Sequence, residues 1–174
     1  MNGDETFEEE LSQSVLPADV LAMVADESSA LPFAELAALS SPDDVLVGSV
    51  LTLWGQLTAS RRRDFLAALQ QLSNDDATLD FERIQLSAVR DSDVATRMLA
   101  IRGIWESERQ EYVDVLGDIL SDDTEANVRA TAAAGLASFV VSNEFGMLPL
   151  EIGERLTESL RERIEDVTED DEVR

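Results

Sequence analysis

The sequence predicts an all-α fold, and three observations support this expectation. Apolar residues recur three or four positions apart along most of the chain, which places them on one face of a helix. Alternation of apolar and polar residues, the mark of a half-buried strand, is hard to find. Breaks between the periodic segments carry Asp-Asp or Ser-Asp clusters, which suit helix N-caps, and four prolines.

The helices expected in the first half of the chain cover residues 5–15, 18–28, 32–40, 43–57 and 61–73. Those expected in the second half cover residues 79–90, 93–106, 109–121, 124–142 and 149–166. Pro32, Pro42 and Pro149 fall in the first turns of their helices, where a missing N–H does no harm. The apolar faces of four helices are Phe65, Leu66, Leu69 and Leu72; Phe81, Ile84, Ala88 and Val89; Tyr112, Val113, Leu116, Ile119 and Leu120; and Ile152, Leu156, Leu160 and Ile164.

The composition excludes several kinds of chemistry. The 174 residues include 37 acidic and 13 basic side chains and no histidine or cysteine, for a formal charge of −24. A Ser-His-Asp or Cys-His nucleophile, a zinc site of the usual ligands and a disulfide are therefore excluded. Such an acidic chain is not expected to bind nucleic acid or an anionic membrane. We expect no catalytic residue, no cofactor and no metal.

An internal repeat organises the second half of the chain. The segment from Asp91 through Arg97 to Gly103 matches, after a shift of 32 residues, the segment from Asp123 through Arg129 to Gly135. A fainter copy is expected earlier, where Asp43 and Gly55 keep the same spacing. Serine stands there in place of the arginine. A second amphipathic helix follows each copy, so the predicted unit is a helical hairpin, and the 48-residue offset from Asp43 to Asp91 predicts an inserted helix near 79–90.

Each residue of the repeat has an expected structural role. Asp91 and Asp123 are predicted to cap the first helix of their hairpins. Gly103 and Gly135, with small neighbours, are expected to let adjacent hairpins approach closely. Arg97 and Arg129 are expected to be structural, each hydrogen-bonded within its own or an adjacent repeat, for example to a carboxylate or carbonyl of the preceding repeat. Because one hairpin cannot bury its own apolar face, the hairpins are expected to stack.

The motif Asp-x-x-x-x-Val-Arg-x-x-Ala-Ala-x-Gly-Leu at 123–136 resembles the core of a HEAT repeat. From about Leu31 onward the chain is similar to an uncharacterised bacterial family of HEAT-repeat domain proteins, through Leu39-Ser40, Arg61-Arg62-Arg63, Leu79-Asp80-Phe81 and the two repeat segments. The resemblance implies an α-α superhelix, a HEAT-like solenoid, that presents a surface to other proteins. Residues 1–30 are expected to form an acidic helical segment and residues 31–174 the solenoid. The spacing of 32 residues is shorter than in standard HEAT units.

We therefore expect a non-enzymatic scaffold or adaptor located in the cytoplasm. Its partner is expected to be another protein, with a basic segment if the acidic faces of the second helices align. The candidate partner-binding residues are Asp114, Asp118, Glu154, Glu158 and Glu162. A face that serves solubility alone is the simpler interpretation. The alternative function is a lyase-type or regulatory HEAT-repeat domain associated with an enzyme.

Two further features have two interpretations each. Asn74, Asp76, Thr78 and Asp80 alternate like half of a calcium loop, but Leu79 and Gln85 replace its glycine and glutamate, which favours a capped turn. Trp54 and Trp105 are expected to pack in the core rather than to anchor a partner.

The carboxyl end supports a further expectation. Val173-Arg174 repeats Val128-Arg129, which predicts the opening of another repeat and a natural array that extends further. The last layer is then expected to expose an apolar flank beside a frayed tail. The alternative is that the helix near 149–166 is itself the cap.

Overall fold

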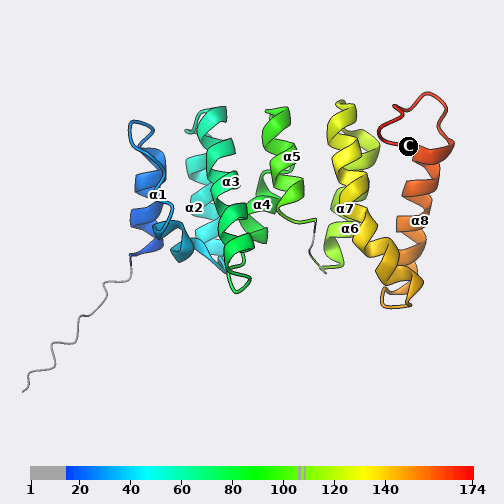
Figure 1. The fold of residues 1–174 in the computed structure, drawn as a ribbon, viewed down its shortest axis with the longest axis horizontal. Helices are drawn as coiled ribbons and strands as arrows, with labels where there is room; N and C mark the ends of the chain where they lie inside the picture. Colours follow the sequence, from blue (N-terminus) through cyan, green and yellow to red (C-terminus); the bar gives the residue numbers. More distant parts are fainter. Residues whose placement is uncertain (1–14, 106, 108) are drawn as a thin grey trace, which may run out of the picture.

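The computed structural model describes residues 15–105, 107 and 109–174, and within them the chain forms eight α-helices, one 3-10 helix and no strand (Figure 1). The elements are α1 (Pro17–Ala25), η1 (Glu35–Leu39), α2 (Asp44–Trp54), α3 (Ala59–Asp75), α4 (Glu82–Ser87), α5 (Val94–Arg102), α6 (Glu111–Asp122), α7 (Ala126–Glu144) and α8 (Leu150–Glu165). The expectation of an all-α fold is confirmed. The helix expected over 5–15 falls almost entirely outside the described residues.

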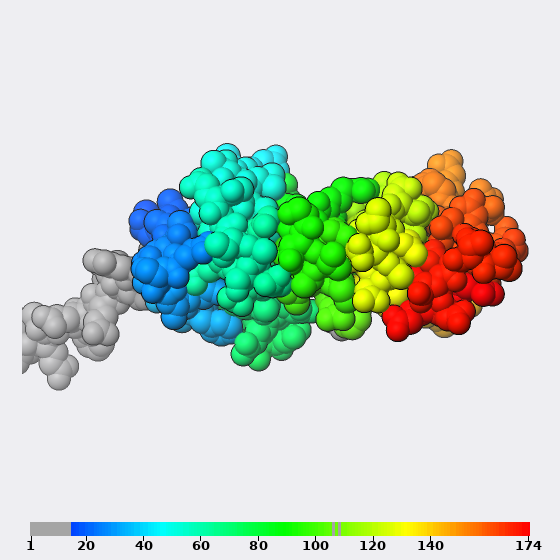
Figure 2. Space-filling model, turned by 90° about the horizontal axis from the view of Figure 1, so that it is seen from above, coloured from blue at the N-terminus to red at the C-terminus, as the bar shows by residue number. Residues whose placement is uncertain are grey.

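The helices follow one another along the long axis of the molecule (Figures 1 and 2). Helices α3, α5 and α7 contact one another in sequence order and form one row. On the other side of the molecule α2 contacts α4, and α6 contacts α8. Helices α6 and α7 pack directly against each other. The chain is therefore a stack of helical layers, each joined mainly to its neighbours.

Two clusters of buried apolar side chains hold these layers together. The first cluster joins α1, η1, α2, α3 and α4, with Phe65, Leu69 and Ile84 at its centre. The second runs from α3 to the carboxyl end and includes Tyr112, Leu116 and Phe139. Helix α3 belongs to both clusters, because Phe65 packs in the first and its neighbour Leu66, about 100° further round the helix, packs in the second.

Local sequence explains where several helices begin. The side chain of Asp43 accepts a hydrogen bond from the backbone N–H of Leu46 at 2.7 Å, and Thr58 and Asp93 cap α3 and α5 in the same way. The segment expected as an α-helix over 32–40 is instead the short 3-10 helix η1. Pro32 and Pro42 lie on either side of η1, and the segment between them is too short to form a stable α-helix.

Residues 17–30 pack in the same array as the residues after them. Val20 and Val24 of α1 are fully buried in the first cluster. Arg61 of α3 donates four hydrogen bonds to backbone carbonyls at and after the end of α1, those of Met23, Val24, Asp26 and Ser29. The boundary expected at residue 30 is therefore not a break in packing within the described residues.

The outer side of α8, which faces away from α6, is partly uncovered. Ile164 is 56% exposed, and Leu160 is only half-buried. The segment after α8 is not frayed, contrary to expectation. Val173 is buried in the second cluster, and Arg174 N–H donates to the carbonyl of Asp170 at 3.2 Å, which closes one helical turn.

Candidate protein-binding surface

A repeated arginine–carboxylate pair joins neighbouring layers and so helps to set how the helices lie relative to one another. Arg97 Nε and Nη2 donate to the two carboxylate oxygens of Asp123 at 2.8 and 2.9 Å, and the two side chains are 10% and 11% exposed. Arg129 makes the same kind of bidentate pair with Glu169, a carboxylate that is 3% exposed. Arg97 therefore contacts the segment before α7, and Arg129 contacts the segment after α8. Both arginines are hydrogen-bonded within the fold as expected, but their carboxylate partners lie later in the chain rather than in the preceding repeat.

Each of these arginines also binds a carbonyl before its own helix. Arg97 Nη1 donates to the carbonyl of Asp91 at 2.9 Å, and Arg129 Nη1 donates to that of Asp123 at 2.8 Å. One guanidinium therefore ties the start of its own helix to a later segment, which is the start of α7 for Arg97 and the segment after α8 for Arg129. The hydrogen bond from Arg129 holds the pKa of the Glu169 carboxyl below its ordinary value.

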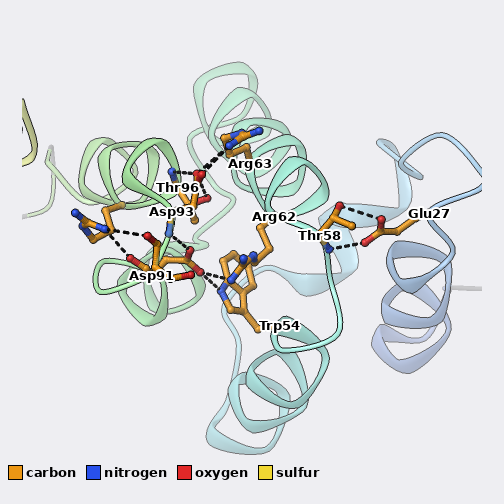
Figure 3. Close-up of polar contacts among 10 residues, drawn as sticks. Glu27, Trp54, Thr58, Arg62, Arg63, Asp91, Asp93 and Thr96 are labelled. Atoms are coloured by element: carbon orange, nitrogen blue, oxygen red, sulfur yellow. Dashed lines mark hydrogen bonds and ion pairs between the residues drawn. The ribbon is translucent and has the colours of Figure 1, made fainter.

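The first member of this series is Arg62, which sequence analysis missed. It lies four residues after the N-cap of α3, the same place that Arg97 and Arg129 take in α5 and α7. Its Nη1 donates to Asp91 at 2.6 Å, and the Asp91 side chain is 2% exposed (Figure 3). The fainter copy expected at Asp43 is therefore wrong, because the matching helix is α3.

When α3 is aligned with α5 and α7 through these arginines, no inserted helix is needed. The arginines of the series lie at positions 62, 97 and 129, and α4 is the helix that follows α3 as α6 follows α5. The signal in the sequence was an arginine four residues after a capping threonine, inside the triplet 61–63. Glu169 carried no comparable signal, because it lies five rather than six residues before the next arginine.

The aspartates of the repeat do not occupy the cap positions expected for them. The N-cap residues of α5 and α7 are Asp93 and Glu125, each two residues further on. Asp91 and Asp123 accept hydrogen bonds from the backbone N–H groups of these residues at 2.8 and 3.0 Å. The same two carboxylates also accept hydrogen bonds from Arg62 and Arg97 of the preceding helix in the row.

The two repeat glycines lie at contacts between helices. A Cβ built on Gly103 would come within 2.4 Å of the Gln85 side chain of α4. A Cβ on Gly135 would lie 3.3 Å from Leu116 of α6. Gly55, in contrast, has no atom within 4 Å of such a Cβ. The helix contact at position 103 therefore requires glycine. At position 135 a side chain would be tightly packed, and at position 55 there is open space for one.

The tryptophans have different surroundings. Trp54 of α2 donates its indole N–H to Asp91 at 2.6 Å (Figure 3). Its ring lies 6.4 Å from that of Phe65, centre to centre. The guanidinium of Arg62 lies 6.0 Å from the Trp54 ring centre. Trp54 is thus part of the junction between layers, whereas Trp105 remains 39% exposed.

Four of the five candidate partner-binding residues meet in one groove between α6 and α8. The groove has a volume of about 260 Å³. Its carboxylates are Asp114, Asp118, Glu158 and Glu162, and it is completed by Val113, Gly117, Ser121, Arg155 and Ser159. We call this set the α6/α8 groove.

Part of its negative charge is neutralised locally. Arg155 of α8 donates to both oxygens of Asp114 at 2.8 and 3.0 Å, and this hydrogen bonding raises the pKa of the guanidinium. Arg90 donates to Asp118 at 3.3 Å, and Arg161 pairs with Glu158 within α8. Among the described residues, Glu162 has no ion pair.

Glu154, the fifth candidate, lies on the outer side of α8. It lines a second groove of about 580 Å³ together with Asn143, Leu150, Gly153, Arg155, Thr157, Glu158 and Arg161. Glu158 is shared by the two grooves. The acidic residues of α8 therefore face two ways, which their spacing in the sequence did not indicate.

Metal binding and membrane insertion can be considered for the described residues. No three carboxylates among them come together as metal ligands. None of their helices is long and apolar enough to cross a bilayer. Comparison of the chain with protein-family models, with curated proteins and with solved structures finds no match.

Proposed function

We propose that the protein is a non-enzymatic scaffold, a HEAT-like solenoid that binds a basic segment of another protein in the α6/α8 groove. The observation that carries this proposal is the meeting of four carboxylates from two helices, with the acids of α8 lying 40 to 48 positions after those of α6. Carboxylates that serve solubility alone have no need to converge on one groove. The proposal includes a cytoplasmic location, which fractionation of the native host tests.

Electrostatics favours a cationic partner here. Arg155 lines the groove and pairs with Asp114, and Arg90 and Arg161 pair with Asp118 and Glu158. Four acids against these three arginines leave a net negative charge, carried by Glu162, which has no ion pair among the described residues. The whole chain adds its formal charge of −24, which attracts cations over a longer range. Exposed charges of this kind raise the association rate and are screened at a distance of about 8 Å in physiological salt. Binding is therefore expected to weaken steeply as salt rises.

The test uses an arginine-rich peptide as the probe, with fluorescence anisotropy at low, physiological and high salt. The variant Asp118→Asn/Glu162→Gln removes two charges from the groove. Asp19→Asn/Asp64→Asn removes two exposed charges from α1 and α3 and is the matched control. We expect the groove variant to weaken binding about tenfold, which corresponds to the ~1.4 kcal/mol expected for two partly screened charge contacts. The control variant should change binding less than twofold.

Two results would overturn the proposal. Equal weakening in both variants would show that the peptide responds to net charge rather than to the groove. Binding that does not change with salt would show that electrostatic attraction is not its basis.

A further inference from the structure

The outer side of α8 repeats the surface on which α8 itself packs. A shift of 40 residues places Tyr112, Leu116 and Leu120 of α6 on Ile152, Leu156 and Leu160 of α8. The five α6 residues that line the α6/α8 groove are Val113, Asp114, Gly117, Asp118 and Ser121. Their counterparts Gly153, Glu154, Thr157, Glu158 and Arg161 all line the groove on the outer side of α8. The same pattern of residues therefore occurs twice, once against α8 and once on the outer side of α8, where Gly153 and Leu156 are buried but Leu150 and Ile164 remain exposed.

The copy against α8 shows what such a surface accepts. Helix α8 contacts α6 through small and apolar residues, with Ser159 3.4 Å from where a Cβ on Gly117 would lie. At the edge of this contact Arg155 makes its bidentate pair with Asp114. Asp114 corresponds to Glu154 on the outer side of α8. An occupant of the outer side is thus expected to place an arginine or lysine against Glu154.

The copy on the outer side of α8 also has an apolar floor. Next to the groove that contains Glu154, a second hollow of about 350 Å³ is lined by Val140 and Asn143 of α7 with Leu156, Leu160 and Ile164 of α8. Thr157 and Arg161 line both hollows, so together they form one continuous surface along α8. Leu150, at its start, is 76% exposed. Exposed apolar side chains gathered in this way mark a binding surface.

Charge identifies the kind of occupant. The charged residues that line this surface are Glu154, Glu158, Glu165, Arg155 and Arg161. Arg155 pairs with Asp114 and Arg161 with Glu158, so among the described residues Glu154 and Glu165 have no ion pair, and a helix that carries basic residues is complementary to them. A second copy of the chain is not, because it carries the same charge of −24 and its own α8 already packs against its own α6. We therefore infer that the outer side of α8, from Leu150 to Ile164, binds an amphipathic helix of a partner protein, with an apolar stripe and a basic residue that pairs with Glu154.

This inference rests on the proposed scaffold function but concerns a different face. The probe is a labelled helical peptide of the α8 sequence that keeps Arg155 and Ser159, which contact α6, together with the apolar Ile152 and Leu156, and has lysine at every acidic position. A matched peptide has glutamate in place of the arginine. Binding to the full chain is measured by fluorescence anisotropy, and the oligomeric state of the chain by light scattering.

We expect the lysine-rich peptide to bind and the glutamate-substituted peptide to bind at least fivefold more weakly. Ile164→Asp should weaken binding at least tenfold, and Glu154→Gln at least threefold. Ile164 is 56% exposed, so its substitution leaves the buried core intact, and circular dichroism checks this. The matched control is Val45→Asp on α2, where the side chain is 78% exposed, and it should leave binding unchanged.

The inference is overturned if Ile164→Asp binds the peptide as well as the unaltered chain, or if both peptides bind equally. A dimer that Ile164→Asp converts to a monomer would also overturn it, since a second copy would then be the occupant. Failure of the proposed function is distinguishable, because Asp118→Asn/Glu162→Gln changes residues of the α6/α8 groove that do not line the outer side of α8.

Discussion

Replacement of Arg97 by alanine is expected to destabilise the chain more than any surface substitution. The change removes two hydrogen bonds to Asp123 and one to the Asp91 carbonyl, and it leaves the Asp123 carboxylate 11% exposed without its cation. Breaking a buried ion pair by removing one partner costs about 3–5 kcal/mol. Because both side chains keep slight solvent contact, we expect the lower end, about 3 kcal/mol.

Urea unfolding followed by circular dichroism measures this loss. With an m-value of about 2 kcal/mol per molar urea for a domain of this size, Arg97→Ala should lower the unfolding midpoint by about 1.5 M. The matched control is Arg161→Ala, which breaks an exposed pair with Glu158 whose side chains are 53% and 61% exposed. That pair is worth ~0.5 kcal/mol or less, and its loss should shift the midpoint by less than about 0.3 M.

A double-mutant cycle separates the pair from the rest of the arginine side chain. Asp123→Ala alone should also destabilise strongly, and adding it to Arg97→Ala should cost much less than the sum of the two. If Arg97→Ala and Arg161→Ala lie within about 0.5 kcal/mol of each other, the argument that the arginine series ties the layers together is refuted.

Two further predictions concern the same contacts. Gly103→Ala should destabilise by about 2 kcal/mol, because its Cβ would displace the buried Gln85 side chain, whereas Gly55→Ala should be neutral or stabilising by up to ~1 kcal/mol; thermal and urea unfolding measure both. Glu169→Gln should lower stability at pH 7 and flatten its fall in acid, which urea midpoints at pH 7, 5 and 3 measure. The Arg129 hydrogen bond lowers the pKa of Glu169 in the folded state, so its contribution is present above the unfolded value of about 4.3 and is lost as the pH falls through the folded pKa.

Each of these predictions has an outcome that contradicts it. If Gly103→Ala is as stable as Gly55→Ala, then the contact with Gln85 does not require glycine. If the acid profile of Glu169→Gln runs parallel to that of the unaltered chain, the carboxylate does not contribute through its pairing with Arg129.

The sequence by itself determined the all-α class, most helix positions and the importance of the two repeat arginines. These are local properties, because helix periodicity and capping act within a few residues of the chain. The coincidence of Arg97 with Arg129 was visible because both lie the same distance after an aspartate. The same local rules mistook Asp91 and Asp123 for caps, because they cannot show which of two nearby aspartates starts the helix.

The tertiary structure alone decided what each arginine pairs with and which way each acidic residue faces. Arg62 and Asp91 are 29 residues apart, and Arg129 and Glu169 are 40 apart, so a shift in helix packing changes the partner without changing the sequence pattern. Glu154 and Glu158 both lie on one helix, yet Glu158 also lines the groove toward α6 while Glu154 lines the outer groove alone. A helix has several exposed faces, and the neighbours packed around it determine which of them become grooves.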